Sequence, residues 1–155
     1  MTSIVRFALV FFISATATVL LPLQSSGQGT PPKTDQASIQ GTWVVVAAEK
    51  KGKKLTDDEL ADLKLTMAIT DNVLTTSTKG QPEPGSKFTL DSAKNPKSID
   101  FFDFKGRHEA AGIYRFDGDN RFTIRISVDR NTRPADFTSP LNDSDRQLTL
   151  VRKAK

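Results

Sequence analysis

The sequence predicts an all-β protein: an eight-stranded antiparallel up-and-down barrel with one short helix after the first strand. Short apolar runs alternate with polar residues and are separated by turn residues along the 155-residue chain. Only residues 56–64 carry the signals of a helix. Consecutive strands with short turns form a meander, and eight of them can close on themselves, which removes the exposed edges. An open two-sheet sandwich is the alternative that this pattern leaves open.

The first part of the chain has the features of a signal peptide, which we place at residues 1–27. Arg6 precedes an apolar run that ends at Leu23, and the small residues 25–27 follow, where a signal peptidase would cut. An apolar run of about 17 residues is also at the lower limit for a membrane span, so an uncleaved anchor is the alternative. We predict an exported protein, periplasmic or extracellular, with no membrane span after cleavage.

Residues 28–37 are polar and contain two prolines, and we predict a flexible linker there, followed by one folded domain at 38–153. The first strand is predicted at 42–49, a β-branched run that starts with the only Trp, Trp43. Both of its faces are apolar, so both should be covered in part. Four lysines between residues 50 and 54 then form a polar turn. A solvated loop is one interpretation of them, and a contact with phosphate or acidic lipid is the other.

The predicted helix begins after Thr56. Thr56 and Glu59 have the spacing of a capping box, in which each side chain bonds the backbone N–H of the other. The acidic residues of the first turn suit the positive end of the helix dipole, which accounts for them without a calcium site. Leu60 and Leu63 give the helix one apolar side over about two turns.

The remaining strands follow from alternation and turn residues. Asp117-Gly118-Asp119-Asn120 is the strongest hairpin signal, because Gly and Asn tolerate the positive φ of tight turns. The strand after it shows the clearest alternation, with Phe122, Ile124 and Ile126 on one side. A long connection then spans residues 129–145. Further strands are predicted at 65–70, 73–78, around Phe88 and Leu90, and at 98–104, 111–117, 121–128 and 147–152.

Gly41-Thr42-Trp43 resembles the G-x-W signature of lipocalins. Together with residues 95–100, 112–119 and 133–137, residues 39–45 are similar to a secreted lipocalin-like (calycin-type) domain family of unknown function, as found in planctomycete-type bacteria. The resemblance covers residues 38–153 and implies a calycin barrel and export. It also implies that Arg152 packs over the Trp43 ring and closes one end of the barrel. It carries no catalytic or ligand residues, and the chain is shorter than vertebrate lipocalins and lacks their disulfides.

The composition argues against catalysis and metal binding. The chain has no Cys and one His, His108, in a predicted polar turn, which leaves no basis for a thiolate nucleophile, a His-based triad or a zinc site. Asp100 and Asp103 face opposite sides of a strand and do not form a carboxylate pair. We therefore predict no enzyme, no cofactor and no metal site. The net charge of +4 comes from interspersed signs, so nucleic acid is not a predicted partner.

The aromatic residues define the remaining question, which is whether the barrel is filled or partly hollow. In the first case we predict a structural or interaction domain that contacts an envelope protein through its loops. In the second we predict a binding domain for a small hydrophobic molecule. Phe101, Tyr114, Phe122 and Ile124 are the candidate lining residues for such a ligand. The sequence carries no prediction of the oligomeric state.

Overall fold

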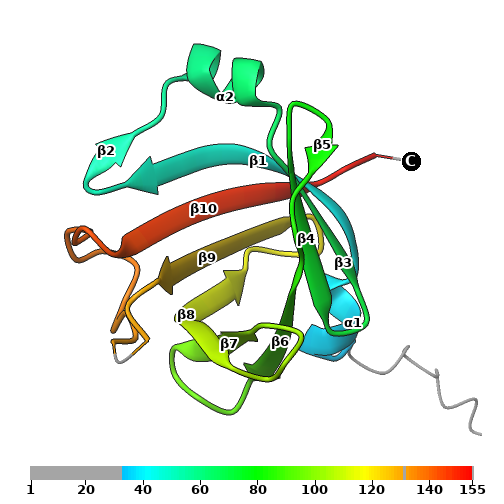
Figure 1. Cartoon of the computed structure of the whole chain (residues 1–155), viewed down its shortest axis with the longest axis vertical. Helices are drawn as coiled ribbons and strands as arrows, with labels where there is room; N and C mark the ends of the chain where they lie inside the picture. Colours follow the sequence, from blue (N-terminus) through cyan, green and yellow to red (C-terminus); the bar gives the residue numbers. More distant parts are fainter. Residues whose placement is uncertain (1–32, 131, 155) are drawn as a thin grey trace, which may run out of the picture. The chain divides into compact units, whose positions relative to one another are not determined.

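The computed structural model describes residues 33–130 and 132–154, and eight antiparallel strands in this part of the chain form a closed barrel (Figure 1). Each strand pairs with the next one along the chain, and the last pairs with the first, which closes the barrel. The predicted fold class is therefore confirmed. The strands are β1 (Gly41–Lys50), β3 (Thr66–Thr70), β4 (Val73–Thr78), β6 (Ser86–Asp91), β7 (Lys97–Phe102), β8 (His108–Phe116), β9 (Arg121–Ser127) and β10 (Asp145–Arg152).

Two short strands and two short helices complete the described elements. The two-residue strands β2 (Lys53–Lys54) and β5 (Gln81–Pro82) pair with β1 and β4. Helix α1 (Asp35–Ile39) precedes β1, and α2 (Asp57–Leu63) follows β2. The predicted signal peptide, residues 1–27, lies outside the described residues. Helix α1 overlaps the last three residues of the predicted linker, 28–37, and continues into the predicted domain. It forms there because the Thr34 hydroxyl accepts a hydrogen bond from the Ala37 N–H and Ile39 is fully buried.

The predicted capping box of α2 is present. The Glu59 N–H donates to the Thr56 hydroxyl, and the Thr56 N–H donates to the Glu59 carboxylate at 2.8 Å. These two hydrogen bonds stabilise the first turn of α2. Burial of the apolar side of α2 contributes less to its stability than the sequence suggests. Leu60 and Leu63 are only half-buried, because α2 lies on the outside of the barrel (Figure 1).

Strand β1 contains a bulge that the alternation pattern does not predict. The register with β10 shifts between Val45 and Ala47, so Trp43, Val45 and Ala48 are the residues buried in the interior. Strict alternation would have placed Ala47 on the face of Trp43 and Val45. A bulge puts one extra residue into the strand and reverses the facing of the residues beyond it. Val46 is consequently exposed.

The turn between β7 and β8 ends β7 two residues earlier than predicted. The Asp103 carboxylate accepts the backbone N–H groups of Lys105 and Arg107, both at 2.8 Å. This local hydrogen bonding competes with the strand ladder, so β7 ends at Phe102 and the Phe104 side chain is 58% exposed. His108 is the first residue of β8 and not a turn residue.

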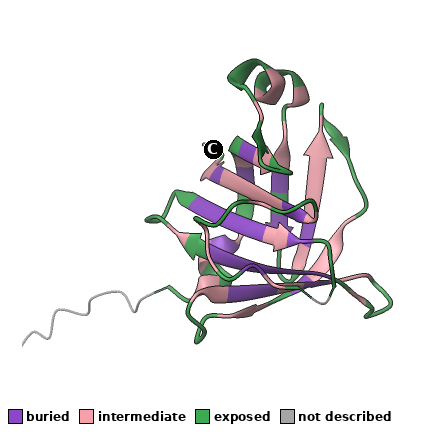
Figure 2. Ribbon diagram, turned by 90° about the vertical axis from the view of Figure 1, so that its left-hand side faces the viewer, coloured by how far each residue is buried: buried purple, intermediate pink, exposed green. Residues whose placement is uncertain are grey.

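The connection between β9 and β10 covers the outer face of β7, β8 and β9. It buries residues on that face which alternation alone would leave in water, including Ile113, Thr123 and Arg125. Residues 110–114 of β8 and 122–125 of β9 are consecutive and all buried, so the middle of β8 and most of β9 are covered on both faces. Figure 2 shows this buried centre of the fold in purple. We call residues 129–144 the covering loop.

Candidate functional site

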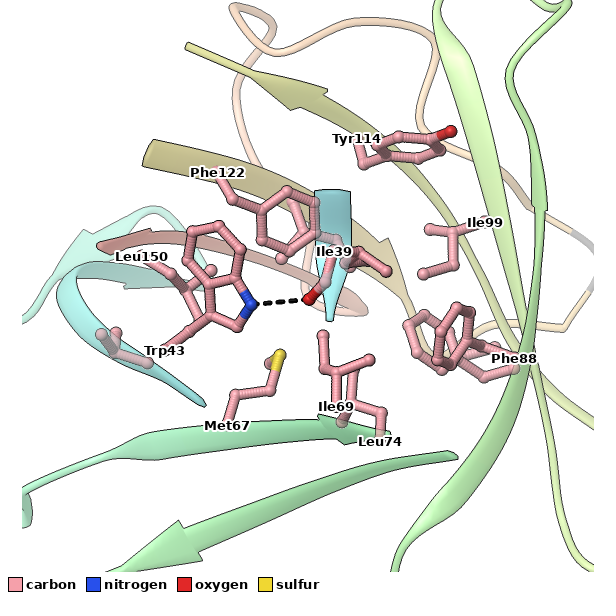
Figure 3. Packing of buried hydrophobic residues seen from close by; sticks show 14 of the residues in the cluster. Ile39, Trp43, Met67, Ile69, Leu74, Phe88, Ile99, Tyr114, Phe122 and Leu150 are labelled. Atoms are coloured by element: carbon pink, nitrogen blue, oxygen red, sulfur yellow. Dashed lines mark hydrogen bonds between the residues drawn. The ribbon is translucent and has the colours of Figure 1, made fainter. Parts of the chain in front are cut away.

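The barrel interior is filled at the end where α1 lies. Trp43 is fully buried, and its indole Nε1–H donates to the Ile39 carbonyl at 2.7 Å (Figure 3). The rings of Trp43 and Phe122 pack with their centroids 5.6 Å apart. Ile124 and Leu150 are completely buried beside them. This half of the barrel is close-packed core and leaves no room for a ligand.

Arg152 fastens α1 over this end. Its guanidinium carbon lies 4.2 Å from the centre of the Trp43 ring. Its Nη1 and Nη2 atoms donate to the carbonyls of Gln40 and Ser38 at 2.6 and 2.7 Å. The carbonyls at the end of a helix have no partner within the helix, so a cation that binds them there is favourable. Trp43, Arg152 and α1 together close the end of the barrel.

The opposite end, which we call the mouth, is hollow. A cavity of about 310 Å³ opens there between strands β3, β4, β6, β7, β8, β9 and β10. Most of the side chains that line this cavity are apolar. The lining residues are Met67, Leu74, Thr76, Pro84, Ser86, Phe101, Glu109, Ala110, Ile126, Val128 and Leu148. Polar residues are confined to the rim, where the Ser86 hydroxyl donates to Glu109 at 3.1 Å. An apolar floor with a polar rim suits a hydrophobic ligand.

The four candidate lining residues are divided between these regions. Phe101 lines the mouth cavity. Phe122 and Ile124 are completely buried in the filled half and do not line the mouth cavity. The Tyr114 ring joins the same core (Figure 3). Its hydroxyl donates to the Asp35 carboxylate of α1 at 2.7 Å. Alternation identifies the inward-facing residues, but it does not indicate their depth in the barrel.

His108 lies on the outside of the barrel, away from the mouth cavity. Its Nε2 is 3.1 Å from an Asp100 carboxylate oxygen, and the same oxygen accepts a hydrogen bond from Arg133 at 2.6 Å. Arg133 also donates to the Gly112 carbonyl at 2.6 Å. This cluster joins the covering loop to β7 and β8. Among the described residues, no group of three or more acidic or His side chains is placed to hold a metal ion.

A buried ion pair is the second attachment of the covering loop, and the sequence gives little sign of it. Arg125 and Asp145 are 4% and 3% exposed, and Arg125 Nη2 lies 2.7 Å from the Asp145 carboxylate. Arg125 also donates to the backbone carbonyls of residues 136, 139 and 140. An Arg at an outward position of a strand normally faces water. The one signal in the sequence is the length of the predicted connection at residues 129–145, since a connection this long can cover the outer face of the strand that carries Arg125.

Comparison with protein-family models, curated proteins and solved structures finds no match for this chain. Within the described part of the chain, none of the helices has the length and apolar character that crossing a membrane requires. The barrel and its cavities are thus the basis on which a function can be argued.

Proposed function

We propose that this protein is an exported lipocalin-like barrel that binds a small hydrophobic molecule in its mouth and carries out no catalysis. The observation that carries the proposal is the apolar mouth cavity at the open end of the barrel. Export is supported by the sequence of residues 1–27. A ligand in the mouth would displace water from apolar surface, which is favourable.

The size of the mouth cavity limits the ligand. At about 310 Å³ it lies at the lower end of the range for small-molecule sites, roughly 300–1,000 Å³. The filled half below it prevents deeper entry, because Trp43, Phe122 and Leu150 occupy that space. The ligand is therefore either a compact apolar molecule or the end of a longer acyl chain whose remainder stays outside the mouth.

Native mass spectrometry tests the proposal on protein purified from the cells that naturally make it. We expect the wild-type protein to carry an additional small-molecule mass. Ala110→Leu should remove that mass, because Ala110 lines the cavity and the larger side chain would occupy it. Ala93→Leu, in an exposed loop, is the matched control and should keep the mass. Wild-type protein without any bound small molecule would contradict the proposal.

The second candidate function is an interaction domain that contacts an envelope protein through its loops. The filled half of the barrel favours it, as do two exposed apolar side chains near the mouth, Phe104 and Val128, which are 58% and 53% exposed. In this case the purified protein would carry no small-molecule mass. Phe104→Ser and Val128→Ser would instead weaken a complex with another envelope protein, without a loss of fold measured by circular dichroism.

A further inference from the structure

A second and larger cleft lies at the closed end of the barrel, on the side of the filled core. It has a volume of about 840 Å³ and lies between α1, the start of β7, the end of β8, the turn that follows β8, and the covering loop. We call it the α1 cleft. The residues that matter for its chemistry are Asp35, Lys97, Tyr114, Arg115, Asp119 and Phe137.

The floor of the α1 cleft is a preformed polar network. The Asp35 carboxylate accepts hydrogen bonds from the Tyr114 hydroxyl at 2.7 Å and from the Lys97 ammonium at 2.8 Å. Burial acts to raise the pKa of Asp35, but the hydrogen bonds from Lys97 and Tyr114 outweigh it and lower that pKa. Burial and the bond to Asp35 raise the pKa of Tyr114, so its hydroxyl stays protonated. The floor thus contains one negative and one positive charge that compensate each other.

The walls present aromatic faces and unused hydrogen-bonding groups. The Arg115 guanidinium lies over the Phe137 ring, 4.7 Å from its centre, which holds the guanidinium in place. Its Nε is 3.6 Å from Asp117, while within residues 33–130 and 132–154 its two Nη atoms have no hydrogen-bond partner. Over the same residues, the Asp119 carboxylate has neither an ion pair nor a hydrogen bond. The cleft therefore offers a free donor and a free acceptor.

The mixture of charges in the α1 cleft disfavours a ligand that carries a single net charge. An anion drawn to Arg115 would share the cleft with the carboxylates of Asp35, Asp119 and Asp136. A cation drawn to Asp119 would share it with Lys97 and Arg115. Like charges brought together on binding cost several kcal/mol, so either ion meets repulsion. A neutral ligand avoids both penalties.

We propose that the α1 cleft binds a neutral saccharide. A sugar hydroxyl both donates and accepts hydrogen bonds, so it can pair with Arg115 and with Asp119 alike. The C–H groups on the face of a sugar ring pack on aromatic surface, whose π electrons attract their partial positive charge, and Phe116 and Phe137 are the Phe residues that line the cleft. This site is separate from the mouth cavity, which shares no residue with it.

Titration of the ¹⁵N-labelled protein followed by NMR tests the proposal. The probes are glucose, N-acetylglucosamine, maltose and cellobiose, with benzylammonium and benzoate as ionic comparisons of similar size. We expect at least one sugar to give saturable shifts at the backbone amides of Gly118, Asp119 and Ala135, with affinity in the millimolar range. Asp119→Ala should weaken that binding at least fivefold. Asp58→Ala, an exposed carboxylate on α2, is the matched control and should leave it unchanged.

Three results would overturn the proposal. The first is the absence of shifts with every sugar at 50 mM. The second is that benzylammonium or benzoate binds in the cleft while the sugars do not. The third is that the sugars shift residues of the mouth, such as Ala110 and Leu148, instead of those of the cleft. The first two results do not bear on hydrophobic binding in the mouth, so the two proposals can fail independently.

Discussion

At the scale of single residues, Arg152 and Trp43 connect the two ends of the folded chain. Arg152 is close to the C-terminus, yet it donates to the carbonyls of Ser38 and Gln40 and covers the Trp43 ring. The Trp43 indole in turn donates to Ile39. Trp43, near the start of β1, and Arg152, at the end of β10, therefore hold α1 against the barrel. Without these contacts a helix of five residues has too few internal hydrogen bonds to persist.

Arg152→Ala should lower the free energy of unfolding by about 2–3 kcal/mol, because it removes two charge-assisted hydrogen bonds and the stacking on Trp43. Urea denaturation followed by Trp43 fluorescence measures this change in the free energy of unfolding. The fluorescence emission of the folded variant should also shift to longer wavelength, because α1 packs less tightly over Trp43. Lys153→Ala, an exposed neighbour, is the control and should change stability by less than about 0.5 kcal/mol. An equal effect of both variants would contradict this role of Arg152.

Asp35 gives the fold a specific sensitivity to acid. Its pKa in the folded state lies below the ordinary value of 3.8. A depressed folded-state pKa contributes stability above the ordinary pKa, and that contribution is lost as the pH falls through the folded-state value. The free energy of unfolding of Asp35→Asn should therefore decline less steeply than that of the wild type below about pH 4. Lys97→Met should flatten the same part of the curve. Parallel curves for wild type and Asp35→Asn would show that this carboxylate does not contribute.

At the scale of elements, the covering loop is the part of the structure that the sequence predicts least well. Regular alternation in β9 indicates correctly that Phe122 and Ile124 face inward. It cannot indicate that the outward Arg125 is buried, because that depends on where a distant irregular segment lies. The same applies to Arg133, whose hydrogen-bond partners are on β7 and β8. Contacts between segments distant in the chain leave no periodic signal, whereas strands, the α2 capping box and tight turns do.

Asp145→Ala, at the start of β10, should lower the free energy of unfolding by about 3–5 kcal/mol, because it leaves the Arg125 charge buried without its anionic partner. Chemical denaturation measures the loss, and amide hydrogen exchange should show faster exchange throughout the covering loop. The exposed pair Lys51–Asp143, 4.0 Å apart, provides the control, and Asp143→Ala should cost less than about 0.5 kcal/mol. A small effect of Asp145→Ala would mean that the carbonyls around Arg125 are sufficient to compensate its charge.

At the scale of the whole molecule, one end of the barrel is closed by side chains and the other is open. The sequence correctly predicts the closed eight-stranded barrel, because alternation, turn residues and strand number depend on local patterns. It could not predict which part of the barrel interior is filled by side chains. An inward-facing aromatic ring either packs in the core or lines a cavity, depending on its depth in the barrel, and strand register and bulges determine that depth. Phe101 and Phe122 are both inward-facing Phe residues, yet one lines the mouth cavity and the other is core.

NMR titration of the protein with decanoate, a small amphiphile with an apolar chain, is the most direct test of the central claim that the mouth binds a hydrophobic molecule. We predict saturable shifts of the methyl groups of Met67, Leu74 and Leu148, which line the mouth. The Trp43 indole N–H should not shift, because it is bonded to Ile39 within the filled half. If those methyl signals stay unchanged up to the solubility limit of decanoate while the protein remains folded, the mouth is not a binding site for such molecules.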